Sequence, residues 1–254
     1  MLLNKNVIAT ADDFGLSSSV NRAILKCFDL SVINSTSFLT NTILFEESVN
    51  TLHQNPVIQN VGVHVNFTEG KPVSNFKLKK YLDSEGNWDS LKTTKVLSIL
   101  NAEAKTAFTA EIDAQINKAL SHNVTITHFD SHNHVHTLPQ FQGVFFNAAK
   151  KHNLKLRLAQ SYKENSYIKY TYRKYINNKL IANDLNYSDR FETVGYYLNN
   201  AHVNNVVTEI MLHPDLDTNG NLTDHFEGSV LTEWINYIKK ENVANIQEKV
   251  NYYR

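Results

Sequence analysis

The sequence predicts an α/β protein whose parallel strands form one sheet or barrel. Short runs of β-branched residues alternate with longer helical patterns along the chain, which is typical of βα units. Polar residues recur where four of these runs end, as expected when the strand ends of one sheet build a site. The 254 residues are enough for one large domain or two small ones, and we expect a single domain over residues 1–254.

The N-terminal part contains the first three expected strands. Residues 6–10 form a buried run, and Ser17 to Ser19 are suited to cap the helix that follows. Residues 32–40 and 60–68 have the composition of a second and a third strand. The expected inner face of the first helix carries apolar side chains at helical spacing, at Val20, Ile24 and Phe28.

The next elements continue the alternation of helix and strand. Residues 123–130 predict a fourth strand, and Pro139 suits the first turn of a helix that runs to residue 152. Residues 154–159 and 206–212 predict later strands. Before the fourth strand, residues 105–120 predict an amphipathic helix with four apolar residues four positions apart: Phe108, Ile112, Ile116 and Leu120.

Two segments interrupt this rhythm. Residues 70–92 are rich in Gly, Pro, Asn and Asp, which predicts a long loop or small lobe after the third strand. Residues 161–190 carry many Tyr, Lys and Asn residues. They predict either a solvated helical face or an aromatic surface that stacks on sugar rings.

The charge composition argues against a protein that binds nucleic acid or a membrane surface, because 25 Lys and Arg balance 25 Asp and Glu. The N-terminal residues do not resemble a signal peptide, and no run approaches 18 apolar residues. We therefore expect a soluble, cytoplasmic protein with a small substrate. The sequence does not decide whether it forms a homodimer. The single cysteine, Cys27, has helical spacing from Ile24 and is expected to be a buried structural thiol.

Four polar clusters follow the expected strands: "ADDFG", "HVNFTEG", "HFDSHNHVH" and "LHPD". The carboxyl ends of parallel strands lie on one face of a sheet or barrel. These clusters are far apart in the sequence, but the predicted fold brings them together. The sequence therefore predicts one polar site at this face.

Residues 127–136 contain four histidines and one aspartate. If the segment is extended, alternation places all five on one side. Neighbouring imidazoles without a counter-ion or metal would cost stability when protonated, so a metal site explains the cluster. Histidine and carboxylate donors without cysteine suit zinc, magnesium, manganese or iron.

The residues outside this cluster each have two interpretations. Asp12 and Asp13 can both face the mouth of the sheet, one as a metal ligand and one as a base, or they are a helix cap and a solvated turn acid. His64 alternates with valines and is either a ligand or a hydrogen-bonded core residue. His213, which Pro214 follows, is either a general acid or a loop histidine.

Together these segments resemble the YdjC-like carbohydrate deacetylase family, which includes chitooligosaccharide deacetylases. The resemblance extends over residues 6–215 and is weak beyond them. It implies a distorted (βα) barrel with one divalent ion, Mg²⁺ or Zn²⁺, at the carboxyl ends of the strands. The matching segments, in the family's order, are "TADDFGLSSSVNRAI", "INSTSFLTN", "GVHVNFTEGKPV", "THFDSHNHVH" and "EIMLHP".

The resemblance also implies roles for individual residues. Asp13, His64 and His132 correspond to the metal ligands, Asp12 to the general base and His213 to the general acid. The choice of His132 over the other histidines of its cluster depends on the family pattern. A further set is expected to contact substrate: Asn66, Thr68, His134, His136 and Arg157.

Two positions depart from the family pattern. Ala159 stands where a proline usually follows the Arg-Leu pair, and Asp215 stands where a glycine usually follows the His-Pro pair.

The activity that the resemblance implies is metal-dependent removal of the N-acetyl group from an acetylated amino sugar or short oligosaccharide, with release of acetate. Two alternatives stay open: a metal-dependent hydrolase of another amide or of a phosphoester, and a non-catalytic carbohydrate-binding relative.

Overall fold

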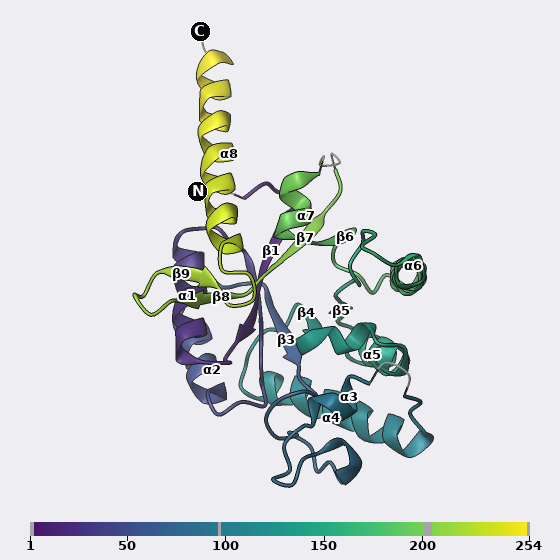
Figure 1. Ribbon diagram of the computed structural model, residues 1–254. Coiled ribbons are helices and arrows are strands. Elements are labelled where there is room, and N and C mark those ends of the chain that lie inside the picture. The colour runs from purple at the N-terminus through teal and green to yellow at the C-terminus, as the bar shows by residue number, and fades with distance from the viewer. Residues whose placement is uncertain (1–2, 96–97, 201–204, 253–254) are drawn as a thin grey trace.

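The computed structural model contains a curled sheet of seven parallel strands with helices around it (Figure 1). It describes residues 3–95, 98–200 and 205–252, with side chains described up to residue 242. The strands are β1 (Val7–Phe14), β2 (Ser35–Phe38), β3 (Val61–Val65), β4 (His128–Ser131), β5 (Lys155–Leu156), β6 (Arg190–Thr193) and β7 (Thr208–Leu212).

The strands follow chain order around the curl. The sheet order is β5-β4-β3-β2-β1-β7-β6, so its two edges are consecutive strands of the chain. Backbone hydrogen bonds link these edges outside the ladder: Ser161 donates to Phe191 at 2.9 Å, and Leu156 donates to Leu185 at 2.6 Å. The sheet is therefore a distorted (βα) barrel, and the predicted fold class is confirmed.

Helices connect successive strands, and two predicted helix starts are confirmed. The Ser17 side chain accepts a hydrogen bond from the Val20 amide at 3.1 Å, and Pro139 occupies the first turn of its helix. Cys27 is fully buried on the inner face of the first helix, and burial raises the pKa of its thiol to about 12. The helices are α1 (Ser18–Asp29), α2 (Phe45–Gln54), α4 (Ala102–Ser121), α5 (Pro139–His152), α6 (Tyr167–Ile181), α7 (Val194–Asn199) and α8 (Val230–Tyr252).

Several predicted boundaries differ from the structure. β1 continues past residue 10, so the two aspartates of "ADDFG" lie inside the strand. β4 begins only at His128 instead of residue 123, because its neighbour β3 starts at Val61, which accepts a hydrogen bond from the Thr127 amide at 2.9 Å. Residues before Thr127 have no strand to pair with. The sequence patterns also did not single out α2, α7 or β6.

The predicted inner face of α4 is correct for three of its four apolar residues. Phe108, Ile112 and Ile116 are fully buried, whereas Leu120 is 47% exposed. A step of four residues turns by about 40° more than one full helical turn, so Leu120 lies about 120° around the helix from Phe108. The expectation that Leu120 faces the core was therefore wrong.

Residues 70–92 pack against the barrel. They include a short helical turn η1 (Lys79–Tyr81), the helix α3 (Ser90–Thr93) and an isolated bridge between Leu82 and Trp88. The rings of Tyr81 and Trp88 lie 4.9 and 5.8 Å from the ring of Phe108 on α4. This aromatic cluster attaches the segment to the outer layer. That residues 1–254 form one domain, with residues 70–92 as a small lobe, stays a prediction.

The segment rich in Tyr and Lys contains α6, whose surface is largely solvated. Tyr167, Ile168 and Tyr175 are exposed on it, and Lys163 lies 3.5 Å from the ring centre of Tyr167. Exposed aromatic rings fit both a solvated helical face and an aromatic surface, so the choice between the two stays a prediction. Within the described residues, every helix falls short of the length and apolar character needed to cross a membrane.

Gly62 on β3 packs directly against a buried histidine. A Cβ atom at this position would overlap the ring of His128, which is itself buried. We expect Gly62→Ala to lower the free energy of unfolding by about 1–3 kcal/mol, measured by urea titration. Gly143→Ala is the matched control, because Gly143 is exposed on α5 with no atom within 4 Å of the added Cβ; it should stabilise by about 0.5–1 kcal/mol. Equal effects of the two substitutions would contradict the packing described here.

Candidate metal centre and active site

A cavity of about 260 Å³ lies at the carboxyl ends of the strands. The side chains on its wall come from β1, β3, β4 and the segment after it, the junction of β6 and α7, β7 and the segment after it, and the start of α8. The predicted convergence of distant polar clusters is therefore present. Six of the residues singled out in the sequence line this cavity: Asp12, Asp13, His64, His132, His134 and His213.

A bulge in β1 allows two adjacent aspartates to face the same cavity. The register against β2 shifts between Ala11 and Phe14, and Asp13 has a φ of 69°. This left-handed conformation is uncommon outside glycine, although aspartate tolerates it better than most residues. Regular alternation would send Asp12 and Asp13 to opposite faces, so the bulge is what brings both to the site.

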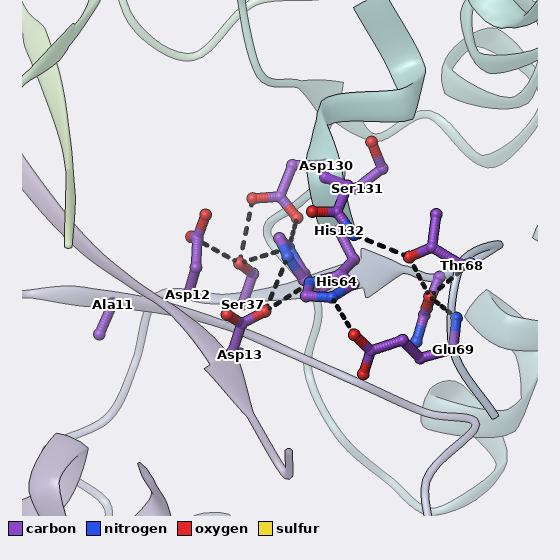
Figure 2. Close-up of polar contacts among 12 residues, drawn as sticks. Ala11, Asp12, Asp13, Ser37, His64, Thr68, Glu69, Asp130, Ser131 and His132 are labelled. Atoms are coloured by element: carbon purple, nitrogen blue, oxygen red, sulfur yellow. Dashed lines mark hydrogen bonds and ion pairs between the residues drawn. The ribbon is translucent and has the colours of Figure 1, made fainter. Parts of the chain in front are cut away.

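Ser37, His64 and Asp130 form a hydrogen-bonded group beneath the cavity (Figure 2). His64 and Asp130 are direct partners in the β3–β4 ladder, and His64 Nδ1 donates to Asp130 Oδ1 at 2.7 Å. The Ser37 hydroxyl on β2 lies 3.0 Å from Asp130 Oδ2 and 3.1 Å from Asp12 Oδ1. Because Asp130 engages Nδ1, His64 presents Nε2 to Asp13, whose Oδ1 is 3.2 Å away.

Arg157 is fully buried among three carboxylates. Its Nη1 and Nη2 donate to the two oxygens of Asp12 at 2.6 and 2.7 Å. Nη1 also lies 2.7 Å from Asp130 Oδ2, and Nε donates to Glu209 Oε1 at 2.8 Å. Asp12 on β1 and Glu209 on β7 belong to strands that are not neighbours of β5, which Arg157 follows, so these two contacts cross the barrel interior. Burial acts to raise the pKa of Asp12, but the charges of Arg157 and His64 and the hydrogen bonds from Arg157 together outweigh it, and the pKa is lowered.

His132 reaches the site because the chain turns directly after β4. It begins the short segment η2 (His132–Thr137), in which Asn133 and His134 have φ values of 54° and 52°. The turn places His132 Nδ1 2.8 Å from Asp13 Oδ1. The regular alternation expected through residue 136 was therefore wrong beyond the end of β4.

Three side chains have the arrangement of a metal centre. Asp13, His64 and His132 each offer a donor atom, and these atoms all lie within 4.8 Å of one another. Oδ2 of Asp13 is buried without a well-formed hydrogen bond among the described residues, and His225 Nε2 lies 3.4 Å from it. The nitrogen of each ring that does not face Asp13 has a carboxylate near it. Asp130 lies beside Nδ1 of His64, and Glu69 lies 3.5 Å from Nε2 of His132. Such outer carboxylates orient imidazole ligands toward a metal, so the residues fit a divalent cation.

A second group of potential ligands has a different character. Asp12, His64 and Asp130 also place donor atoms within 4.8 Å of one another. The guanidinium of Arg157 already contacts both carboxylates of this group. A cation there would lie against another cation, so we assign the ion to the first group.

The charges of the buried network also favour a divalent ion. The pKa values of Asp12, Asp13 and Asp130 are lowered despite burial, so these three aspartates are negatively charged, and the charge of Arg157 balances only one of them. Burial acts to lower the pKa of His64, but Asp130 and Asp12 raise it to about 10. Burial also opposes protonation of His132, but its hydrogen bond to Asp13 raises the pKa to about 9. Two protonated rings supply the same charge as one divalent cation.

The other histidines of the cluster have separate surroundings. The ring of His128 packs 4.6 Å from that of Tyr187, and burial lowers its pKa to about 4. His136 is buried, with Nδ1 2.6 Å from the Ser131 hydroxyl. Burial lowers the pKa of His134 to about 4, so its ring is neutral near pH 7. Of these three histidines, His134 is the one that lines the cavity.

Asn66, Thr68 and Arg157 support the site from outside the cavity wall. Asn66 Oδ1 accepts hydrogen bonds from the amides of Thr68 and Glu69 at 2.8 and 3.1 Å, which shapes the loop that carries Glu69. Thr68 Oγ1 accepts from Asn133 Nδ2 at 3.0 Å. Arg157 lies behind Asp12. Direct contact of these residues with a substrate stays a prediction.

His213 follows β7 and faces the cavity. Its amide donates to Asp224 Oδ2 at 2.8 Å, and its Nδ1 lies 4.0 Å from Asp224 Oδ1. Burial lowers the pKa of His213, and the charges of Asp12 and Asp13 oppose this shift. Burial thus disfavours the protonated ring of His213, while the nearby carboxylates favour it.

Several residues of the site were not identified in the sequence. Asp224 and His225 come from the hairpin of β8 (Pro214–Leu216) and β9 (Leu222–Asp224) and the turn after it, and His225 Nε2 lies 3.4 Å from Asp13 Oδ2. No pattern marked this hairpin. Glu209 did leave a signal, because it is a charged residue inside the apolar run "VVTEIML".

Comparison with known proteins agrees with this architecture. Residues 6–246 match the family described as YdjC-like protein. The chain belongs to this family. A carbohydrate deacetylase of Clostridium beijerinckii is 33% identical to this YdjC-like protein over 161 residues, which cover 63% of each chain. The chain therefore spans less than two thirds of that relative's length. A carbohydrate deacetylase of Listeria monocytogenes is 29% identical over 214 residues, 82% of this chain and 80% of the relative.

A solved structure shares the barrel of this YdjC-like protein. It is a protein of Enterococcus faecalis V583 assigned to cellobiose-phosphate cleavage, with a TM-score of 0.68 and 23% identity. The match covers 85% of this chain and 84% of the other. This likeness supports the fold.

Binding of a divalent ion is expected to release protons. His64 and His132, with pKa values of about 10 and 9, are protonated at pH 7, but a ring must be neutral to act as a ligand. The apparent affinity for Zn²⁺ should therefore rise as the pH is raised from 6.5 to 8.5. Calorimetry of chelator-treated protein in buffers of different ionisation enthalpy measures both the affinity for Zn²⁺ and the number of protons released on binding. Affinity that falls over this range, or binding without proton release, would contradict the assignment.

Proposed function

We propose that this protein is a metal-dependent hydrolase that removes the N-acetyl group from an acetylated amino sugar or a short oligosaccharide such as a chitooligosaccharide. The observation that carries the proposal is the group of Asp13, His64 and His132 in a cavity that Asp12 and His213 also line. Relatives named carbohydrate deacetylase support an acetylated sugar as the substrate.

Asp13, His64 and His132 would hold one divalent ion, Mg²⁺ or Zn²⁺. When bound, such an ion makes water more acidic and polarises the acetamide carbonyl. Two imidazole donors favour Zn²⁺, since Mg²⁺ prefers oxygen ligands. Elemental analysis of the purified protein identifies the ion.

Asp12 would act as the general base. Its lowered pKa keeps the carboxylate ionised at neutral pH, and the two hydrogen bonds from Arg157 fix its orientation. As the water oxygen bonds to the carbonyl carbon, Asp12 accepts the proton that the water loses. Arg157 then has a positioning role, because it holds Asp12 without facing the cavity.

His213 would act as the general acid. The C–N bond breaks only when the nitrogen receives a proton, because an unprotonated amide anion is a poor leaving group. His213 in its protonated form, which the charges of Asp12 and Asp13 favour, would donate this proton and become neutral, and acetate and the free amino sugar would leave. The bond from its amide to Asp224 holds the residue at the cavity wall.

An acetate-release screen tests the proposed function. N-acetylglucosamine and its oligomers are incubated with the metal-loaded protein, and acetate and free amine are measured together. Equal amounts of the two products support deacetylation. Hydrolysis of phosphoesters or other amides instead would assign another metal hydrolase, and no hydrolysis with metal bound would favour a non-catalytic relative.

Two substitutions separate the base from the metal ligands. Asp12→Asn keeps Asp13, His64 and His132, so we expect metal content near that of the wild type and turnover lower by about 10²-fold to 10⁴-fold. His64→Ala removes a ligand and should lose both metal and activity. Metal content, turnover and circular dichroism are measured on both variants, the last because Asp12 also pairs with Arg157. A folded Asp12→Asn variant with normal turnover would refute the role of Asp12.

A further inference from the structure

Phe226 is an exposed aromatic residue at the cavity of the proposed metal centre. It is 61% exposed, so most of its ring is accessible to a ligand. It lies in the turn between β9 and α8 and lines the same cavity as Asp13, His64 and His132. A ring in this position would contact whatever molecule fills the cavity.

The turn that carries Phe226 is held in place by a buried carboxylate. Asp224 is 4% exposed, and its Oδ1 accepts hydrogen bonds from the amides of Phe226 and Glu227 at 3.0 and 3.1 Å. Its Oδ2 accepts from the amide of His213, and the amide of His225 donates to the His213 carbonyl at 3.0 Å. These bonds attach the turn to the end of β7, so the position of Phe226 is fixed relative to His213.

Two imidazoles support the ring. The centre of Phe226 lies 4.5 Å from that of His213 at an interplanar angle of 78°, and 4.3 Å from that of His225 at 51°. The ring packs against both histidines and still leaves most of its surface free. The fixed backbone and these contacts restrict its motion, which lowers the entropy cost of binding against it.

The side chains that line the cavity indicate what kind of ligand the exposed face of the Phe226 ring would contact. Val194, Met211 and Val230 line it together with Phe226, beside the acids and histidines. A sugar ring has the matching character, because its hydroxyl groups point outward while its C–H groups form an apolar face. Aromatic rings in ligand sites bury such apolar faces, while polar groups fix the ligand's orientation.

We propose that Phe226 is a specificity-determining residue that stacks on the C–H face of the sugar whose acetamide is cleaved. This inference rests on the proposed function, since it assumes a sugar in the cavity. Stacking would place the ring of the substrate against the turn after β9 and leave its acetamide free to reach the polar groups of the cavity. The hairpin of β8 and β9 therefore contributes to the selection of the substrate.

The test compares substitutions of Phe226 in the metal-loaded, full-length protein, with di-N-acetylchitobiose as the probe. Phe226→Ala should raise KM about tenfold, as loss of about 1.4 kcal/mol of binding would, with kcat within about threefold of the wild type. Phe226→Tyr should stay near the wild type because it keeps the aromatic face, and Phe226→Leu should resemble alanine. A fall in kcat with unchanged KM would show that Phe226 only positions His213 and would overturn the proposal.

Tyr175→Ala is the matched control, because Tyr175 is 63% exposed on α6 and does not line this cavity. It should leave KM unchanged, and an equal increase for both alanine variants would overturn the proposal. If the wild type hydrolyses no acetylated sugar, the proposed function fails, and dissociation constants for the same probe decide the inference. A tenfold weaker Kd for Phe226→Ala then supports stacking, whereas equal constants or no binding to the wild type overturn it.

Discussion

The buried guanidinium of Arg157 is the interaction on which the rest of the site depends. Arg157, Asp12, Asp130 and Glu209 are each at most 1% exposed, and removing such charges from water costs several kcal/mol per ion unless each finds close partners. The fork geometry of arginine meets this need, because it binds both oxygens of Asp12 and reaches one oxygen each of Asp130 and Glu209. The interior of such a barrel is usually packed with aliphatic side chains. In this protein, ion pairs between Arg157 and three carboxylates occupy part of it.

This network determines which atoms remain available for chemistry. Asp130 divides its oxygens between Arg157 and His64, so the His64 ring is oriented with Nε2 toward Asp13. The excess of negative charge at the strand ends then attracts a cation to Asp13, His64 and His132. The same guanidinium holds Asp12 beside this group. The hydrogen bonds of Arg157 and Asp130 therefore both stabilise the barrel interior and orient the residues proposed to act in catalysis.

Much of this arrangement could be predicted because it is local in the sequence. Apolar runs mark most strands, and the polar residues after them mark the face that carries the site. The bulge at Asp13 and the turn at Asn133 and His134 could not be predicted, because each depends on pairing with neighbouring strands or loops. The partners of Arg157 were also hidden, since Asp12 is 145 residues away and Glu209 is 52 residues away. The hairpin that supplies Asp224 and His225 carries no strong periodic pattern.

The most direct test of the account is anomalous diffraction from crystals loaded with Zn²⁺, recorded at the zinc absorption edge. The account predicts one strong peak bound by the Asp13 carboxylate, His64 Nε2 and His132 Nδ1, with Arg157 still paired to Asp12. A peak between Asp12 and Asp130, or zinc bound elsewhere while these three side chains lack a metal, would contradict it.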